Sequence, residues 1–194
     1  MQNFESQNLG PISIQSVIAG FSARPVNDSD IDLVLEWRNS DRVRMNMFEY
    51  HIIPRENHVK WFASLKNNPT SRCWMFLYNG ERIGVITIKL VDKASDTWIW
   101  GCYLGPMRAA PNAGTIMGFV AHEIFFEHMK VARVIGEAVA ANKRSLEFNA
   151  RLGYRTERLF TRTNSQGEDI PAVYLVMDQN EWPSHKKRLL GFLV

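Results

Sequence analysis

The sequence contains few cysteines, and their positions exclude several classes of site. Only Cys73 and Cys102 occur in 194 residues, each inside an apolar, strand-like run, so neither a disulfide framework nor a CxxC metal centre is indicated. Cysteine used this sparingly fits a reducing compartment, and we therefore expect a cytoplasmic protein without a metal. The first twenty residues also lack the basic start and long apolar stretch of a signal peptide.

Long hydrophobic runs and concentrated charge are missing as well. No apolar run reaches the roughly 18 to 20 residues that span a bilayer, so no membrane partner is expected. Formal net charge is +3, and the basic residues are dispersed apart from KKR at 186–188, which is too little for a nucleic-acid partner. At this length one domain is expected. We assign 1–21 to an N-terminal extension, 22–180 to the domain and 181–194 to a solvated C-terminal tail.

What the sequence does contain is an ordered series of strand-like and helix-like patterns. Three local signals mark their boundaries, namely the capping-box spacing of Ser29 and Asp32, the hairpin pair Asn79-Gly80, and Gly153 as a helix terminator. The patterns predict, in order, a strand from Ala23, helices in 31–39 and 55–67, strands in 73–78, 83–91 and 97–105, a helix after Asn112, a strand in 131–140, a helix in 142–153, and strands in 154–160 and 172–177.

The stretch 105–129, GPMRAAPNAGTIMGFVAHEIFFEHM, begins with small residues and becomes helical, with Ile116, Val120 and Ile124 one turn apart. The first N–H groups of a helix have no internal partner and carry partial positive charge, so such a junction suits a phosphate group. The alternative is that Pro111 and Asn112 merely start a surface helix, with Asn112 as its cap.

This order of elements, with an anion-binding loop between the fourth strand and the third helix, resembles the GNAT family of acetyl-CoA-dependent N-acetyltransferases. The resemblance covers about residues 22 to 178, and its second anchor is NKRSLEFNARLGY at 142–154, where Asn142 and the pair Gly153-Tyr154 match the family segment. It implies an α+β fold whose central sheet is mixed but mostly antiparallel, is flanked by helices and is splayed between strands four and five. It also implies acetyl-CoA as cosubstrate.

The departures from the family pattern are informative. The family's loop consensus falls on Ala109, Asn112 and Gly114, and only the last position matches well. Phosphate capture is therefore expected to rest on backbone N–H groups from Asn112 to Thr115, which needs no particular side chain. The family's usual Tyr falls on Asn149, whose amide cannot act as a general acid but can donate a hydrogen bond to the leaving thiolate.

The N-terminal half resembles one group within the family more specifically. The similar segments are WRN at 37–39, VR at 43–44, MF at 47–48, His51 and NHVKWFASLKN from 57. In these segments it is similar to the PseH group, which acetylates UDP-4-amino-4,6-dideoxy-N-acetyl-altrosamine in the pseudaminic acid pathway. The resemblance implies a small-molecule nucleotide-sugar substrate. Arg38, Arg42 and Arg44 lie where a diphosphate would be met, and the expected substrate-binding set is Arg38, Met47, Phe48, His51 and Trp61.

The resemblance also assigns the chemistry. Glu137, a carboxylate inside the apolar run 132–140, matches the proposed base, and burial would raise its pKa towards the useful range. The alternative is a solvent-facing Glu, or one paired with an Arg. Gly101 either marks a bulge that splays its strand or is required only for packing. The expected catalytic pair is Glu137 and Asn149, and the expected cosubstrate-binding set is Cys102, Tyr103, Leu104, Asn112, Ala113, Gly114, Thr115 and Asn142.

Two other functions stay open at this stage. One is protein N-terminal acetylation, as in the Rim group of ribosomal-protein acetyltransferases, for which an acidic peptide groove would speak. The other is a GNAT-shaped module that binds CoA without catalysis, suggested by the missing consensus glycines and by Asn149. The sequence also leaves a homodimer open.

Overall fold

Eight strands form one sheet in the order β1-β2-β3-β4-β5-β6-β8-β7 in the computed structural model, which describes residues 13–105 and 110–194. Neighbouring strands are antiparallel except for β5 and β6, which are parallel, so the predicted mixed, mostly antiparallel α+β fold is confirmed. The strands are β1 (Ile14–Gln15), β2 (Phe21–Pro25), β3 (Ser71–Tyr78), β4 (Glu81–Asp92), β5 (Thr97–Leu104), β6 (Arg133–Val139), β7 (Arg155–Thr163) and β8 (Asp169–Asp178).

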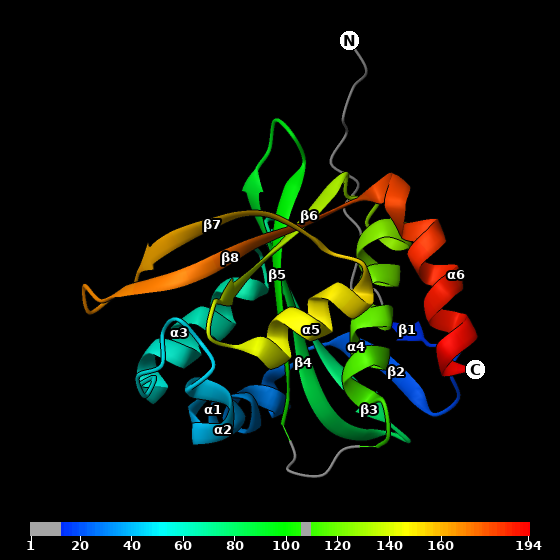
Figure 1. The fold of residues 1–194 in the computed structure, drawn as a ribbon. Helices are drawn as coiled ribbons and strands as arrows, with labels where there is room; N and C mark the ends of the chain where they lie inside the picture. The colour runs from blue at the N-terminus through cyan, green and yellow to red at the C-terminus, as the bar shows by residue number, and fades with distance from the viewer. Residues whose placement is uncertain (1–12, 106–109) are drawn as a thin grey trace.

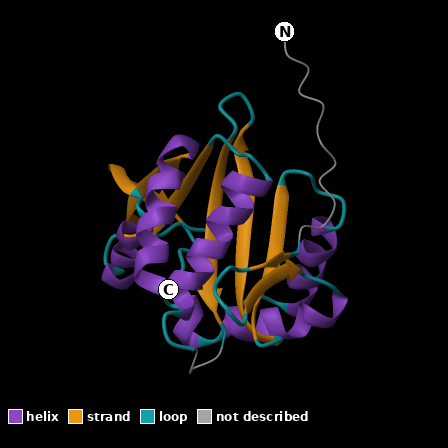
Figure 2. Cartoon of the chain, turned by 90° about the vertical axis from the view of Figure 1, so that its right-hand side faces the viewer, coloured by secondary structure: helices purple, strands orange, loops and turns teal. Residues whose placement is uncertain are grey.

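Helices cover both faces of this sheet. Figure 1 shows α1, α2 and α3 on one side and α4 and α6 on the other, and Figure 2 shows the second group in front of the strands. The helices are α1 (Ile31–Asn39), α2 (Asp41–Arg44), α3 (Arg55–Leu65), α4 (Ala113–His122), α5 (Lys143–Leu152) and α6 (Trp182–Leu193), with 3-10 turns η1 (Asp28–Asp30) and η3 (Gln179–Glu181) and a π-helical turn η2 (Glu123–His128).

Most of the predicted boundary signals act as expected. Asn79 and Gly80 both have positive φ, 48° and 82°, which is the backbone of a tight hairpin between β3 and β4. Pro54 precedes the first turn of α3, and Gly153 ends α5 in the left-handed conformation with φ 113°.

The predicted capping box is shifted by two residues. Ser29 and Asp32 do not form it. Instead the Asn27 side chain accepts from the Ser29 N–H at 3.0 Å, and the Asp30 carboxylate accepts from the Asn27 N–H at 2.9 Å. Asp30 is fully buried and also pairs with Arg24, so tertiary contacts select this carboxylate over the exposed Asp32.

The sheet splays between β5 and β6, as predicted for the fourth and fifth strands. Only Thr97, Trp98 and Ile99 pair with β6, and both strands continue beyond that point without pairing to each other. The predicted bulge at Gly101 is wrong, because Gly101 pairs regularly with Thr87 and the irregularity between β4 and β5 lies at Leu90–Asp92. The splay therefore begins just after Ile99.

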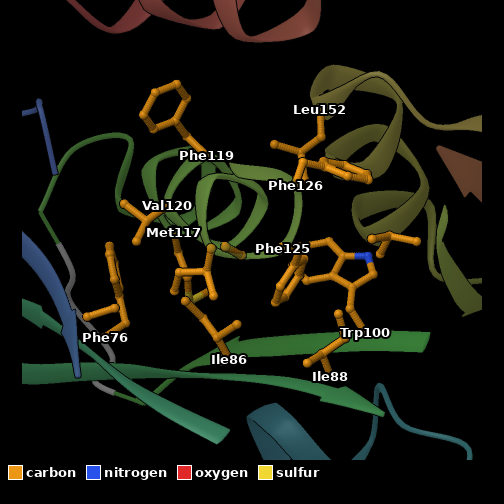
Figure 3. Close-up of a cluster of buried hydrophobic side chains, with 14 of the residues drawn as sticks. Phe76, Ile86, Ile88, Trp100, Met117, Phe119, Val120, Phe125, Phe126 and Leu152 are labelled. Carbon is orange, nitrogen blue, oxygen red and sulfur yellow. The ribbon is translucent and has the colours of Figure 1, made fainter. Parts of the chain in front are cut away.

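Two apolar clusters hold the layers together. The larger one lies between the sheet and the helices α4, α5 and α6, and Figure 3 shows side chains of α4 and η2 meeting Ile86, Ile88 and Trp100 from the strands. The smaller one joins α1 and α3 to the other face through Val34, Phe62 and Met75. Because both faces of β3, β4 and β5 are covered, these strands read as apolar runs rather than as alternating ones.

The C-terminal segment is not the solvated tail that its basic residues suggested. It forms α6, which packs beside α4 and buries Trp182 and Leu189, each 2% exposed. Lys186, from the KKR stretch, pairs with Glu123 and Glu127. Lys186 thus joins α6 to η2, whereas Lys187 and Arg188 remain exposed.

The N-terminal extension contributes to the sheet where it is described. Ile14 and Gln15 form β1 on the edge of β2, and Ile14 and Ile18 are buried. Positions 1–12 of this extension, together with 106–109 and hence the consensus position Ala109, lie outside the described residues. Within 13–105 and 110–194, no helix combines the length and apolar character needed to cross a bilayer.

Candidate active site

The gap between β5 and β6 opens into a cavity of about 1140 Å³ that reaches both faces of the sheet. Trp100, Gly136 and Asn149 line it on the side of α4 and α5, while Arg38, Phe48 and Glu137 line it on the side of α1 and α2. Such a passage lets two ligands meet from opposite faces, which suits transfer between two bound substrates.

The N-terminus of α4 borders this cavity. Asn112 precedes the helix with φ 58° and makes no side-chain cap, so the cap expected as the alternative is absent there. The N–H groups of Gly114 and Thr115 lie in the first turn, where helix geometry provides no carbonyl partner. Asn112, Ala113, Gly114 and Thr115 all line the cavity, which leaves an anion-binding helix end directed at it.

Basic side chains of α5 accompany that helix end. The Arg151 guanidinium donates to the Thr115 hydroxyl at 3.5 Å, and Arg144 and Arg151 both line the cavity. Asn142 lines it too, but its side chain caps α5 by accepting from the Ser145 N–H at 3.0 Å. These arginines add positive charge where the loop lacks the family's glycines.

Glu137 is half-buried rather than enclosed in an apolar surround. It lies on β6, its side chain is 16% exposed, and its carboxylate accepts a hydrogen bond from Arg162 of β7. The Arg162 guanidinium also lies over the ring of Phe48, 4.7 Å from its centre. The pairing with an Arg is one of the alternatives that the sequence left open, and it holds the carboxylate in place at the edge of the cavity.

Asn149 is buried on α5 and faces β6. Its amide nitrogen donates to the Ser145 carbonyl at 2.8 Å, one turn back in the same helix. Its amide oxygen has no partner among the described residues, although the side chain belongs to a residue only 7% exposed. The expected donor therefore faces Ser145, and the group left for a ligand is an acceptor.

The floor of the gap is held by a buried polar chain. The His122 ring donates through Nδ1 to the Gly118 carbonyl at 2.6 Å, so Nε2 accepts from the Tyr154 hydroxyl at 2.7 Å. Burial lowers the pKa of His122 to about 4, which keeps the ring neutral. The Trp100 ring stacks on the Tyr154 ring, with the ring centres 6.0 Å apart. We infer that this chain fixes the orientation of Trp100 beside the gap.

Two side chains of β5 that border the cavity have raised pKa values and stay protonated at neutral pH. Burial raises the pKa of the Cys102 thiol to about 12, so it stays protonated at neutral pH and is a poor nucleophile. Burial likewise raises the pKa of Tyr103. Cys102, Tyr103 and Leu104 continue β5 beyond the last pair with β6, so their backbone borders the gap.

The opposite end of the cavity holds an incompletely paired guanidinium. Arg38 donates through Nη2 to the Glu49 carbonyl at 2.5 Å, while its buried Nη1 has no partner among the described residues. Burial lowers the pKa of Arg38, but a guanidinium remains charged. Met47, Phe48 and Trp61 line the same end with apolar surface. This end suits a ligand that combines an anionic group with a flat or apolar part.

The other arginines of this region form hydrogen bonds and an ion pair within the protein. Arg42 donates to the Leu104 carbonyl at 2.6 Å, and Arg44 pairs with Asp41 and donates to the Tyr50 carbonyl. Neither of them has a buried nitrogen left without a partner among the described residues, as Arg38 has. His51 is exposed, its ring centre lies 4.4 Å from that of Tyr50, and it is not among the cavity-lining residues, so its place in the substrate set stays a prediction.

The other residues of the expected catalytic, cosubstrate-binding and substrate-binding sets all line this one cavity, whereas Arg44 does not. The sequence analysis missed Trp100, Arg144 and Arg151, which also line it. Arg144 and Arg151 lie inside the quoted segment 142–154, and their spacing of seven residues, which places them on one helix face, was the available signal. Among the described residues, no group of three or more His, Cys, Asp or Glu side chains is arranged to hold a metal ion.

Comparison with known families decides what kind of cavity this is. The family model described as acetyltransferase (GNAT) domain matches residues 22–155, more than half of the chain. The chain belongs to the GNAT acetyltransferase family. As a GNAT acetyltransferase it is an N-acetyltransferase that uses acetyl-CoA, which agrees with a site built around a helix N-terminus and a splayed sheet.

Solved structures share the fold of this GNAT protein at low sequence identity. A GCN5-related N-acetyltransferase from Brucella melitensis is 18% identical with TM-score 0.76, covering 94% of this chain and 86% of its own. Mycobacterium smegmatis RimJ, solved with CoA-disulfide, is 18% identical with TM-score 0.77, covering 94% and 95%. Spermidine N-acetyltransferase from Vibrio cholerae, solved with CoA and spermine, is 10% identical with TM-score 0.77, covering 84% and 98%.

Proposed function

We propose that this GNAT enzyme acetylates the 4-amino group of a nucleotide-linked aminodeoxysugar, of the kind used in the pseudaminic acid pathway, within a complex that holds both substrates. The observation that carries the proposal is Arg38, which lines the cavity and whose buried Nη1 has no partner among the described residues. A buried guanidinium group left unpaired is costly, and a diphosphate supplies the acceptors it lacks. Phe48 and Trp61 offer surface for the sugar and base.

Acetyl-CoA is expected on the other side of the gap. Its pyrophosphate would meet the backbone of residues 112–115, and its pantetheine arm would run beside Cys102, Tyr103 and Leu104, where β5 lacks a neighbour on its open edge. Arg144 and Arg151 would add positive charge near the phosphates. Each of these residues borders the cavity.

Glu137 is proposed as the base. A sugar ammonium group gives one proton to the carboxylate, and the neutral amine then attacks the thioester carbon. The Arg162 guanidinium holds the carboxylate beside Phe48. Because Cys102 is a protonated thiol, direct transfer without an acyl-enzyme is the simpler course.

A thiol-release assay with a panel of acceptors tests this proposal. The panel contains a UDP-linked 4-amino-4,6-dideoxy sugar, an N-terminal ribosomal-protein peptide, spermidine and an aminoglycoside. We expect kcat/KM to be highest for the UDP-linked sugar by at least an order of magnitude. Preference for the peptide would instead establish the protein-acetylating alternative, and absence of thiol release with every acceptor would favour a module that only binds CoA.

A further inference from the structure

Glu49 joins the substrate end of the cavity to the turn between β7 and β8. Its backbone carbonyl accepts the 2.5 Å hydrogen bond from Arg38 Nη2. Its carboxylate accepts from the Ser165 N–H, which lies 3.1 and 3.2 Å from the two oxygens, and from the Ser165 hydroxyl. Glu49 is not among the described residues that line the cavity, so its influence on a ligand there passes through a neighbour such as Arg38.

The loop that carries Glu49 has no regular structure of its own. Residues 46–54, between α2 and α3, form neither a helix nor a strand, so side-chain contacts decide the course of their backbone. Helix α1 holds one part of the loop, because the Asn39 amide exchanges hydrogen bonds of 2.9 and 3.0 Å with the backbone of Ile53. Arg44 holds another part by donating to the Tyr50 carbonyl at 2.9 Å.

Three successive residues of this loop contact the β7–β8 hairpin from the other side. The pairs are Phe48 with Arg162, Glu49 with Ser165, and Tyr50 with Glu168. Figure 1 shows the tip of the hairpin on the same side of the molecule as α1, α2 and α3. The middle of the loop is thus anchored by a segment 116 residues further along the chain.

The turn that provides the anchor is itself well ordered. Asn164 is only 5% exposed, and its amide oxygen accepts from the N–H groups of Gln166 and Glu168, each at 3.0 Å. Gly167 adopts the left-handed conformation, with φ 80°, that closes the turn. Hydrogen bonds from N–H and O–H groups to a carboxylate are stronger than those between neutral groups. Ser165 therefore offers Glu49 a fixed attachment point.

We propose that Glu49 is a positioning residue for the acceptor substrate, whose carboxylate, anchored on Ser165, fixes the backbone carbonyl that orients the Arg38 guanidinium. The inference deepens the proposed function and rests on Arg38 meeting a diphosphate. An anchored guanidinium is ordered before the ligand arrives, whereas a loosened one must be ordered on binding, which costs about two- to tenfold in affinity. The same hairpin carries Arg162, which holds the proposed base Glu137.

Calorimetric titration with UDP tests the inference, since UDP carries the diphosphate and requires no acetyl transfer. Glu49→Ala is expected to weaken UDP binding by about three- to tenfold. Glu49→Gln should weaken it by no more than about twofold, because the amide oxygen still accepts from Ser165. Acetyl-CoA affinity should stay within twofold in both variants, which also shows that they fold. Glu56→Ala, an exposed acid on α3 that is not among the described cavity-lining residues, is the matched control.

A double-mutant cycle separates the positioning of Arg38 from a general structural effect. If Glu49 acts through Arg38, Glu49→Ala should weaken UDP binding no further once Arg38→Met has removed the guanidinium. The negative charge of Glu49 also acts on Arg38, and Glu49→Gln removes this charge while keeping the anchor. If Glu49→Ala does not fold, Ser165→Ala serves, since it removes one donor to the carboxylate and should weaken UDP binding by a smaller factor.

The outcomes distinguish this inference from the proposed function. Unchanged UDP affinity in Glu49→Ala, an equal loss in Glu49→Gln, or a further loss in the double variant would each overturn the positioning role of Glu49 and leave the substrate proposal intact. Failure of the wild type to bind UDP, or UDP affinity that Arg38→Met does not reduce, would contradict the proposed function and this inference with it.

Discussion

The carboxylate of Glu137 on β6 is joined to the guanidinium of Arg162 on β7 across the intervening strand β8. Arg162 also covers Phe48, so one side chain connects the proposed base with the apolar end of the cavity. The carboxylate is thereby held at the cavity.

Replacing Glu137 tests its role as base. Glu137→Gln keeps the shape and a hydrogen-bond acceptor for Arg162 but takes up no proton, so we expect kcat to fall by roughly 10²-fold or more. Acetyl-CoA affinity should stay the same. Glu157→Gln on β7, an acid outside the cavity lining, is the control and should retain wild-type turnover. A loss below about threefold in Glu137→Gln at neutral pH would remove Glu137 from this role.

Gly114 tests the binding of the cosubstrate phosphates. An added Cβ would find its nearest neighbour, Leu104, only at 4.0 Å, so the protein tolerates a larger residue while the approach to the helix N-terminus is blocked. Gly114→Val should weaken acetyl-CoA binding by at least tenfold in calorimetry. Gly191→Val, also in a helix and with open space around it, should bind normally. Equal affinities in the two variants would place the phosphates elsewhere.

The buried His122 predicts how stability depends on pH. Its pKa is lowered to about 4 in the folded protein against about 6.5 for a free His, so the unfolded chain binds a proton that the native state refuses. Stability should therefore fall as pH drops from about 6.5 towards 4, by about 2 kcal/mol between pH 7 and pH 5 from this residue.

Denaturant unfolding of His122→Gln at the two pH values isolates that contribution. His58 and His185 also have lowered pKa values and contribute in the same direction in both proteins. The variant should be less stable at pH 7 but should lose about 2 kcal/mol less on acidification. An identical loss in both proteins would mean that His122 takes up a proton as readily in the native state as in the unfolded chain.

The C-terminal helix is expected to be part of the cooperative core. Leu189→Ala should lower the free energy of unfolding by about 2 to 5 kcal/mol, since Leu189 is 2% exposed. Phe192→Ala, in the same helix but 60% exposed, should change it by less than about 0.5 kcal/mol. Urea unfolding followed by circular dichroism measures both, and similar small effects would show that α6 packs weakly.

Periodicity predicted the order of the elements because most segments bury one continuous face. It missed α6, since the charged residues KKR dominate this part of the sequence. The burial of Trp182 and Leu189 depends on α4, which is far away in the sequence. The bulge assigned to Gly101 failed for a related reason. Pairing along β5 is decided by Thr87 on the neighbouring strand and not by the glycine alone.

The sequence predicted most residues of the candidate site but only part of its geometry. Position in the chain brought Glu137, Asn149 and the 112–115 turn to one cavity. Side-chain orientation could not be read in the same way. The orientation of the Asn149 amide depends on the Ser145 carbonyl, and the position of His51 outside the cavity lining depends on the path of the loop around Tyr50.

The most direct test of the account compares kcat/KM for a UDP-linked 4-amino sugar with that for the same sugar lacking the nucleotide, in the wild type and in Arg38→Met. Arg55→Met, an exposed arginine on α3 outside the cavity lining, is the control. The account predicts that the wild type and the control favour the nucleotide-linked sugar by about 100-fold or more, and that Arg38→Met loses at least tenfold of this preference, because a charge-assisted contact is worth about 1.5 to 3 kcal/mol. Equal kcat/KM for the two sugars in the wild type, or an unchanged preference in Arg38→Met, would contradict it.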